Sequence, residues 1–585
     1  MSSNKQSKKA DDVAPKLCGA DIELGNMIVG DASDRVFDAS GEAARALLDE
    51  ICGFSRRSVV GSYSQSYLGD AWSPETGGLY EAPYAHNYDT ALSPPTSGYH
   101  EYAQDRGRKY LTNGGCAYID LNHLEICLPE VTNAFDHVAA FGAMLRIARE
   151  AMVAANSRMP AGRSIKVLVN NSSGHGNSYG SHLNFLLTRA AWENIFSRRM
   201  HYLLFLASYQ CASIILTGAG KVGSENGGAA VRYQISARAD FFEVLCAQQT
   251  TYRRPICNSR DEALTGMPPA AHGDAGLARL HSIFFDNTLC QTSSLLKVGM
   301  TQIVLAMIEQ EQVPAHLLLE DPVEALHCWS HDPDLKATAH LIDGTQCTAV
   351  ELLEAIFEKA RAFVDAGRAD GLVSDVARIM AFWGECLQKL RERDFAYLAA
   401  RIDWVAKLSL LERTAARRGL SWESPGMKYL DHLYSSLDSG DGLYWALERA
   451  GAVEKVVSDG QIERLMHEPP EDTRAWLRAH ILEHAPSGLL DDMDWEMVRL
   501  REKKLAASSW PVHSYATLWM ANPLRFTRAQ CEPILQKAPS LVEGLRQLGL
   551  GRESDTPASS AFSNTAIVHQ KQTKPAVPGK PFAGD

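Results

Sequence analysis

The stretch Ala20-Asp21-Ile22-Glu23-Leu24 alternates apolar and acidic residues, and it decides how the first half of the chain is interpreted. Since successive side chains of a β-strand point to opposite faces, the alternation predicts a strand that carries Asp21 and Glu23 on one face. Two neighbouring carboxylates repel each other unless a cation lies between them. An edge strand with a solvated face would show the same pattern, so the stretch alone leaves both interpretations open.

Residues 117–121, Ala-Tyr-Ile-Asp-Leu, repeat this design, with Tyr118 and Asp120 on one face and Glu125 just beyond. The two stretches together offer four acids and a phenol. Carboxylate oxygens are the ligands that Mg²⁺ prefers, and Mg²⁺ in proteins usually shares its shell with nucleotide phosphates. The pair therefore favours a magnesium site, although the spacing does not fix whether the two strands are neighbours.

The segment 170–184 is polar and punctuated by glycines, and the apolar residues 185–187 follow it. His182 and Asn184 lie two positions apart, so a strand would place them on one face. A single histidine is often only a hydrogen-bonded structural residue. The polar residues around His182 in the sequence favour a role as a ligand or site residue.

Five arginines lie between positions 232 and 260, after a glycine-rich turn at 217–223 that matches neither a Walker A loop nor a dinucleotide fingerprint. The five are Arg232, Arg238, Arg253, Arg254 and Arg260. Guanidinium groups match the geometry of phosphates and carboxylates, so the cluster indicates an anionic substrate group. Surface ion pairs with the neighbouring acids at 240, 243, 261 and 262 are the alternative.

The composition excludes several classes of protein. The 585 residues include 58 Lys and Arg against 70 Asp and Glu, a net charge of −12, which argues against a general nucleic-acid binder. The 12 cysteines form no CxxC pair and no zinc spacing. The first residues do not resemble a signal peptide, and the longest apolar stretch, 202–216, is too short for a membrane span. We expect a cytoplasmic protein without a membrane or nucleic-acid partner.

The pattern along the chain predicts an α+β fold. Short strand-like runs dominate up to about residue 260, and helical periodicity dominates beyond about 292, for example Val350, Leu353, Phe357, Ala360 and Val364. We expect a disordered tail at 1–16, a catalytic domain at 17–455 with a long loop at 61–107, a small helical C-terminal domain at 456–550 and a second disordered tail at 551–585.

The order of these motifs resembles the Pup ligase and Pup deamidase/depupylase family, proteasome accessory factors of the carboxylate-amine ligase superfamily. The resemblance covers about residues 17–500. It rests on the stretches 18–25, 113–125, 170–184, 218–223, 254–262, 295–299, 330–333, 402–405, 469–474 and 494–495. It implies a glutamine-synthetase-like fold, in which helices pack on a curved antiparallel sheet.

The resemblance also implies a set of site residues. ATP would lie on the concave face of the sheet, with Mg²⁺ held by the residues that match Asp21, Glu23 and Glu125, near Tyr118 and His182. Asp120 would be the catalytic residue, as a base in ligation or as the nucleophile or water-activating group in amide hydrolysis. Residues implied to contact phosphate, the modifier's terminal carboxylate or the nucleotide are Arg238, Arg254, Arg260 and Trp495.

Three features resemble the deamidase/depupylase branch: the segment 233–244, the step from Asp120 to Glu125 and the long insertion at 61–107. This branch implies an ATP- and Mg²⁺-dependent amidase that acts on the C-terminal Gln or Glu of a Pup-like protein modifier, or on its isopeptide conjugates, in a proteasome-linked pathway. The alternative within the family is ligation of the modifier through an acyl phosphate.

The chain departs from the family pattern at four positions. Asp21 replaces a glutamate, Cys116 a nucleotide-contacting arginine, Leu183 the middle glutamate of an H-E-N triplet, and Leu264 a histidine. These changes motivate a further alternative, a family member that binds nucleotide or modifier without turnover.

Overall fold

The computed structural model describes residues 13–30, 36–55, 72–73, 78–79, 108–174, 176–261, 276–501 and 514–552. The predicted tails beyond these ranges and most of the loop at 61–107 lie outside the described residues, as does Leu264. Residues 13–16, assigned above to the N-terminal tail, are part of the folded body. Lys16 is fully buried, and its ammonium group lies 2.6 Å from a carboxylate oxygen of Glu309.

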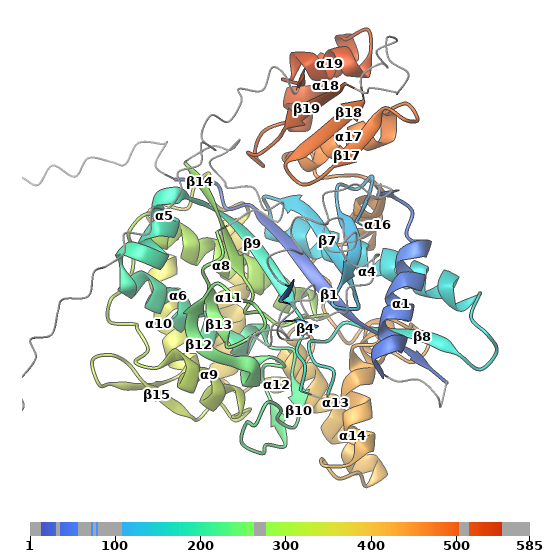
Figure 1. Ribbon diagram of the computed structural model, residues 1–585. Helices are drawn as coiled ribbons and strands as arrows, with labels where there is room; N and C mark the ends of the chain where they lie inside the picture. The colour runs from blue at the N-terminus through green and yellow to red at the C-terminus, as the bar shows by residue number, and fades with distance from the viewer. Residues whose placement is uncertain are drawn as a thin grey trace, which may run out of the picture.

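An antiparallel sheet built around β1 forms the centre of the molecule (Figure 1). Its strand order is β14-β9-β1-β7-β6-β5-β2, and β8 pairs with the second half of β1. The strands are β1 (Cys18–Val29), β2 (Phe54–Ser55), β5 (Lys109–Tyr110), β6 (Cys116–Asp120), β7 (His123–Val131), β8 (Ser164–Leu168), β9 (Ser181–Thr188) and β14 (Leu277–Ser282). Both predicted acidic stretches are strands of this sheet.

Helices cover one face of the sheet. Apolar side chains of β1, such as Ile22 and Leu24, are buried in one large core with α4 (Ala134–Asn156), α6 (Met200–Thr217) and α8 (Gln291–Glu309). Because the apolar residues of β1 point into this core, Asp21 and Glu23 point to the opposite face. α6 is apolar and long enough to cross a membrane by composition alone, but 83% of it is buried inside the fold, as expected for a core helix.

α10 (Ala349–Asp365) confirms the predicted helix and corrects its buried face. Thr348 and Glu351 form a capping box that fixes its first turn. The fully buried side chains are those of Leu352, Leu353, Ile356, Ala360 and Phe363, whereas Val350, Phe357 and Val364 of the predicted stripe are only partly buried. The core-facing stripe is therefore rotated relative to the predicted one.

The remaining elements of the large body surround this core. The helices are α1 (Val36–Glu50), α5 (Arg189–Glu193), α9 (Pro322–Ser330), α11 (Val376–Arg391), α12 (Phe395–Leu398), α13 (Asp403–Arg418), α14 (Pro425–Tyr434), α15 (Leu443–Arg449) and α16 (Asp459–His467), with shorter turns at Asn194–Arg198 and Ala239–Phe241. The strand pairs are β3 (Trp72–Ser73) with β4 (Gly78–Leu79), β10 (Lys221–Val222) with β11 (Tyr233–Gln234), β12 (Phe242–Ala247) with β13 (Arg254–Asn258), and β15 (Thr338–His340) with β16 (Gln346–Thr348).

The C-terminal part is not the helical unit that the sequence predicts. It contains a four-stranded antiparallel sheet, β17 (Leu490–Met493), β18 (Met497–Arg501), β19 (Tyr515–Trp519) and β20 (Gly551–Arg552), with the helices α17 (Ala475–His484), α18 (Arg528–Lys537) and α19 (Leu541–Gln547). In Figure 1 this unit lies at the top, in orange and red. The strands are only two to five residues long, which is why each gives a weak period-2 signal.

The C-terminal unit packs on the edge of the central sheet. Its apolar core continues into Tyr110 on β5, Cys116 and Tyr118 on β6 and Cys127 on β7. α16 belongs to the other core, where it packs on α4. The C-terminal unit therefore borders the same sheet face that carries the predicted site residues.

Candidate active site

Three carboxylates from three strands meet on the face opposite the helices. Glu23 on β1 is paired with Glu125 on β7, which is in turn paired with Tyr118 on β6. Residues paired directly across antiparallel strands point to the same face. One ligand oxygen each from Glu23, Asp120 and Glu125 lies within 4.8 Å of the others. The strands that carry the two predicted acidic stretches are thus brought together through β7.

Burial and like charge make this carboxylate cluster electrostatically unfavourable on its own. Burial raises the pKa of Glu125 well above its ordinary value, and the nearby Asp120, Glu23 and Asp21 raise it further. The Tyr118 hydroxyl donates a hydrogen bond of 2.5 Å to Glu125 Oε1 and holds this carboxylate in place. A cation between the carboxylates would offset their repulsion.

A tight turn positions Asp120 at the end of β6. The turn residues Leu121 and Asn122 both have positive φ, 45° and 68°, as in a two-residue hairpin. Asparagine tolerates this conformation, whereas leucine is strained in it. Asn26 supports the turn, because its amide donates to Asn122 O at 3.1 Å and its oxygen accepts from Leu124 N at 2.8 Å. Asn26 is a positioning residue that the sequence analysis missed.

Asp21 belongs to a second group, with two histidines. Ligand atoms of Asp21, His182 and His281 lie within 4.8 Å of one another. Asp21 and His182 are paired between β1 and β9, and Asn184 donates a hydrogen bond of 3.0 Å to Asp21 Oδ1. The predicted set of metal ligands is therefore split between two neighbouring groups.

His281 on β14 is the member of this group that the sequence analysis missed. Its Nδ1 lies 3.1 Å from Asn258 Oδ1, while its buried Nε2 has no hydrogen-bond partner in the described part of the chain. Burial and nearby arginines hold the pKa of His182 and of His281 well below the usual value, so both rings are neutral and each has a nitrogen able to ligate. His281 stands alone in an otherwise ordinary strand, which leaves no spacing signal.

The loop before β9 is pinned against β1. Gly180 N donates to Glu23 Oε2 at 2.6 Å, and the rings of Tyr179 and His123 lie 4.4 Å apart. A Cβ at position 180 would approach the His182 ring to 2.4 Å, so only glycine leaves room for the imidazole. The glycine-punctuated segment thus helps to orient both Glu23 and His182.

Three of the five predicted arginines approach the histidine side of the site. Arg238 is fully buried and donates to the carbonyls of Ile283 and Phe285, and Arg254 donates to Ser178 O at 3.0 Å. Burial lowers the pKa of Arg238 to about 10 and that of Arg254 to about 9. After burial, the positive charges of Arg238, Arg254 and Arg260 contribute to lowering the pKa of His182.

The other two arginines point away. Arg232 forms a surface ion pair with Glu412, which is not one of the neighbouring acids considered above, and Arg253 is exposed.

Trp495 lies at the opposite end of the site, between the C-terminal unit and the sheet. Its ring meets Tyr110 edge-on at 5.8 Å between centroids, and the Arg478 guanidinium lies 4.8 Å from its ring. The indole N–H is buried and has no hydrogen-bond partner among the described residues. The predicted nucleotide contact and the predicted metal ligands therefore border one continuous face.

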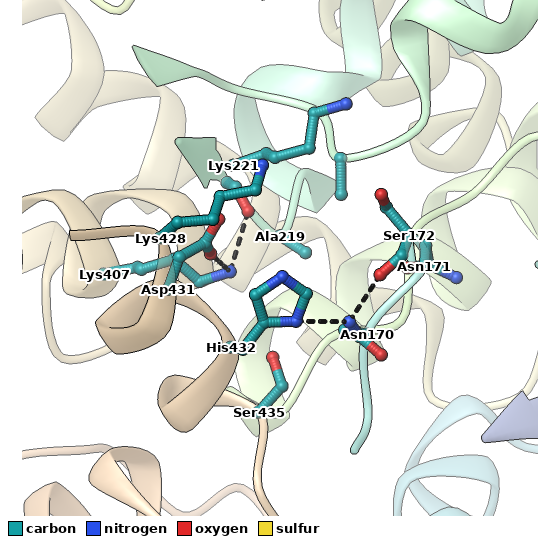
Figure 2. A pocket seen from close by; sticks show the side chains of 12 residues that line it. Asn170, Asn171, Ser172, Ala219, Lys221, Lys407, Lys428, Asp431, His432 and Ser435 are labelled. Atoms are coloured by element: carbon teal, nitrogen blue, oxygen red, sulfur yellow. Dashed lines mark hydrogen bonds and ion pairs between the residues drawn. The ribbon is translucent and has the colours of Figure 1, made fainter. Parts of the chain in front are cut away.

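A polar pocket adjoins this face behind the segment 170–172 (Figure 2). It encloses about 340 Å³, including space open to solvent. Lys407 pairs with Asp431 at 2.9 Å, and His432 lies 3.3 Å from the amide of Asn170. Asn171 in the pocket wall accepts a hydrogen bond of 2.6 Å from Asn287 N, and the Asn287 amide donates to Glu23 O at 3.5 Å, which connects the pocket wall to the site.

Besides Asp21, two further departures from the family pattern lie within the described residues. Leu183 is fully buried in the core on the helical side of β9, because His182 and Asn184 occupy the other face. Cys116 is also fully buried, beneath the C-terminal unit and opposite Tyr110.

The sequence profile of one protein family, described as "Pup-ligase protein", matches residues 54–499. This chain belongs to the Pup-ligase family. It is 35% identical over 452 residues to the depupylase of Acidothermus cellulolyticus, covering 76% of this chain and 83% of that one. Its identity to the Pup deamidase/depupylase of Mycolicibacterium smegmatis is 33% over 446 residues, 75% and 82% of the two chains. The Pup–protein ligase of Acidimicrobium ferrooxidans is 35% identical over 401 residues, 67% and 84%.

Solved structures of the family confirm the α+β, glutamine-synthetase-like fold. The complex between Pup and its ligase PafA matches with a TM-score of 0.67 at 23% identity, over 87% of this chain and 88% of that one. PafA in complex with ADP matches with a TM-score of 0.61 at 26% identity, over 74% and 89%. The resemblance inferred from the motifs is confirmed, and the chain is an enzyme of this family, either an amidohydrolase or a carboxylate-amine ligase.

Proposed function

We propose that this enzyme is a cytoplasmic, ATP- and Mg²⁺-dependent amidase that acts on the C-terminal Gln or Glu of a Pup-like modifier or on its isopeptide conjugates. The observation that carries the proposal is the position of Asp120, at the end of β6 and within 4.8 Å of the oxygens of Glu23 and Glu125. Relatives named depupylase or Pup deamidase/depupylase support the hydrolytic direction.

The donor set fits magnesium and a nucleotide. Glu23 and Glu125 supply the buried carboxylate oxygens that Mg²⁺ prefers, and Asp21 with His182 borders them. Trp495 offers an apolar ring and an unpartnered N–H at the other end of the face, where a base or ribose would lie. A related ligase binds ADP. When bound, metal and phosphates supply fixed charge that polarises the reacting group.

The remaining residues divide the chemistry of amide hydrolysis between them. Asp120 attacks the carbonyl carbon or removes a proton from the attacking water, and the amide C–N bond breaks to release ammonia or the lysine amine; if Asp120 attacks, water then hydrolyses its bond to the acyl group. Arg238, Arg254 and Arg260 neutralise the terminal carboxylate of the modifier or a phosphate. Tyr118 keeps Glu125 in place through its hydrogen bond, and the strained turn after Asp120 fixes the direction of the catalytic carboxylate.

Ligation is the second candidate, because the same face could hold a carboxylate and a phosphoryl donor. The Pup–protein ligase of Acidimicrobium ferrooxidans has the same identity to this chain, 35%, as the depupylase of Acidothermus cellulolyticus. The third candidate, binding without turnover, is motivated by Cys116, Leu183 and Leu264, where the chain departs from the family pattern. Incubation with ATP, Mg²⁺ and a modifier ending in Gln or Glu, followed by mass spectrometry, separates the three. Amide-to-acid conversion supports the proposal, a conjugate supports ligation, and tight nucleotide binding with no product supports the third candidate.

A further inference from the structure

Arg108 lies on the site face of the sheet, beside Tyr118. β5 and β6 pair Lys109 with Ala117 and Tyr110 with Cys116. Side chains alternate along a strand, so Arg108 shares the face of Tyr110 and of the residues paired with it. The Arg108 guanidinium carbon lies 5.4 Å from the centre of the Tyr118 ring. Tyr118 in turn donates to Glu125 of the carboxylate cluster, so Arg108 borders that cluster.

The charge of Arg108 also reaches the C-terminal unit. Burial raises the pKa of Tyr110, Cys127 and Asp494, and in each case Arg108 opposes the rise. Tyr110 contacts Trp495 edge-on, and Asp494 precedes it in the chain. Arg108 lies beside Tyr118 and two positions from Tyr110, which contacts Trp495, and so it lies between the predicted metal ligands and the predicted nucleotide contact.

Two other arginines near Trp495 form hydrogen bonds within the protein. Arg478 donates to Glu130, to Gly114 O and to Trp495 O, and Arg474 donates to Glu130 and to Met520 O. Their guanidinium groups hold the C-terminal unit on the sheet. Position 116, where the family pattern has an arginine, carries a fully buried cysteine.

We propose that Arg108 binds a phosphate group of the nucleotide and so supplies, from the position just before β5, the positive charge that Cys116 does not provide. The inference rests on the proposed function. A nucleotide brings negative phosphates to a face already occupied by carboxylates, so a guanidinium at this point stabilises the bound state through charge-assisted hydrogen bonds. Arg108, between the predicted metal ligands and Trp495, is the residue that would hold a phosphate of a nucleotide bound to both.

Calorimetric titration of ADP and adenosine into the full-length protein, with Mg²⁺ present, tests this role. For Arg108→Gln we expect the dissociation constant of ADP to rise about tenfold or more, because a charge-assisted hydrogen bond is lost. The affinity for adenosine should stay the same, and Arg108→Lys should lie between wild type and Arg108→Gln. Arg361→Gln, a change in an exposed arginine on α10, is the matched control.

Unchanged ADP affinity in Arg108→Gln, or an equal loss for ADP and adenosine, would overturn the assignment. Failure of the wild-type protein to bind ADP would instead refute the proposed function. Adding Cys116→Arg to Arg108→Gln should restore part of the ADP affinity. A folded double variant that binds ADP no more tightly than Arg108→Gln would contradict the proposal that Arg108 replaces an arginine at position 116. The salt dependence of ADP affinity gives a second readout. The affinity should fall less steeply with salt in Arg108→Gln than in wild type, and equal slopes in the two proteins would contradict the role of Arg108.

Discussion

Asp120 combines three properties that suit a catalytic carboxylate. It is only partly buried, it lies beside two buried glutamates, and a turn with two positive φ values follows it. Glu23 and Glu125, in contrast, are almost fully buried and suit a role as ligands. Position and exposure thus divide chemically identical groups into different roles.

Replacing Asp120 with Asn should remove the chemistry and leave nucleotide binding intact. The amide can neither attack as a carboxylate nor accept a proton, so we expect turnover of the modifier to fall at least about 100-fold. Amidase assays and ADP titration of the same preparation check both parts, with the exposed Asp365→Asn on α10 as control. Full turnover by Asp120→Asn would show that Asp120 is not the catalytic residue.

At the scale of elements, the β6–β7 hairpin carries strain at Leu121. This side chain is 40% exposed, so its packing contributes little, while its φ of 45° is unfavourable for leucine. Leu121→Asn should raise the free energy of unfolding by about 0.5–1 kcal/mol, because asparagine tolerates the left-handed conformation. Urea denaturation measures the effect. Leu121→Ala, which keeps the strain, should give no gain, and an equal gain in both variants would refute the explanation.

The contact between β7 and α17 depends on Glu130. Arg474 Nε and Arg478 Nη2 lie 2.7 and 2.6 Å from its carboxylate oxygens. Burial opposes ionisation, but the two arginines lower the pKa of Glu130 to about 2, from an ordinary value of 4.5. Since the folded pKa is the lower one, the stabilisation is complete above pH 4.5 and is lost as the pH falls towards 2.

Glu130→Gln should therefore lower the free energy of unfolding by about 3–5 kcal/mol at neutral pH, because two buried arginines lose their counter-charge. The difference from wild type should shrink as the pH falls from 4.5 towards 2. Denaturation at several pH values, followed by tryptophan fluorescence, checks this. The exposed Glu463→Gln is the control, and a pH-independent difference would argue against the ion pair as the cause.

The same elements explain how far the sequence could predict the structure. The alternation around Asp21 and around Asp120 correctly predicted two strands with acids on one face. Their meeting through β7 depends on pairing between distant segments, which local spacing does not encode. His281 left no signal, because one histidine in a strand has no partner nearby in sequence. The C-terminal sheet was missed because its strands are only two to five residues long, too short for a clear period-2 pattern.

At the scale of the whole molecule, two apolar cores hold the central sheet from opposite faces. The large core fixes β1, β7 and β9 from the helical side, and the C-terminal core closes over β5 and β6 on the opposite face. The candidate site lies between them, with carboxylates and histidines on the sheet and Trp495 on the C-terminal unit. Part of the acidic excess behind the net charge of −12 lies in the site. Several acids are concentrated where a cation would bind, and buried arginines lie around them.

Ammonia release from a Pup-like modifier ending in Gln tests most directly whether this enzyme is an ATP- and Mg²⁺-dependent amidase. With wild-type protein we predict release only when ATP and Mg²⁺ are both present, and its loss when EDTA removes the metal, because the buried carboxylates then repel each other without a counter-charge. Ammonia release that persists without nucleotide and metal, or a conjugate formed without any ammonia, would contradict it.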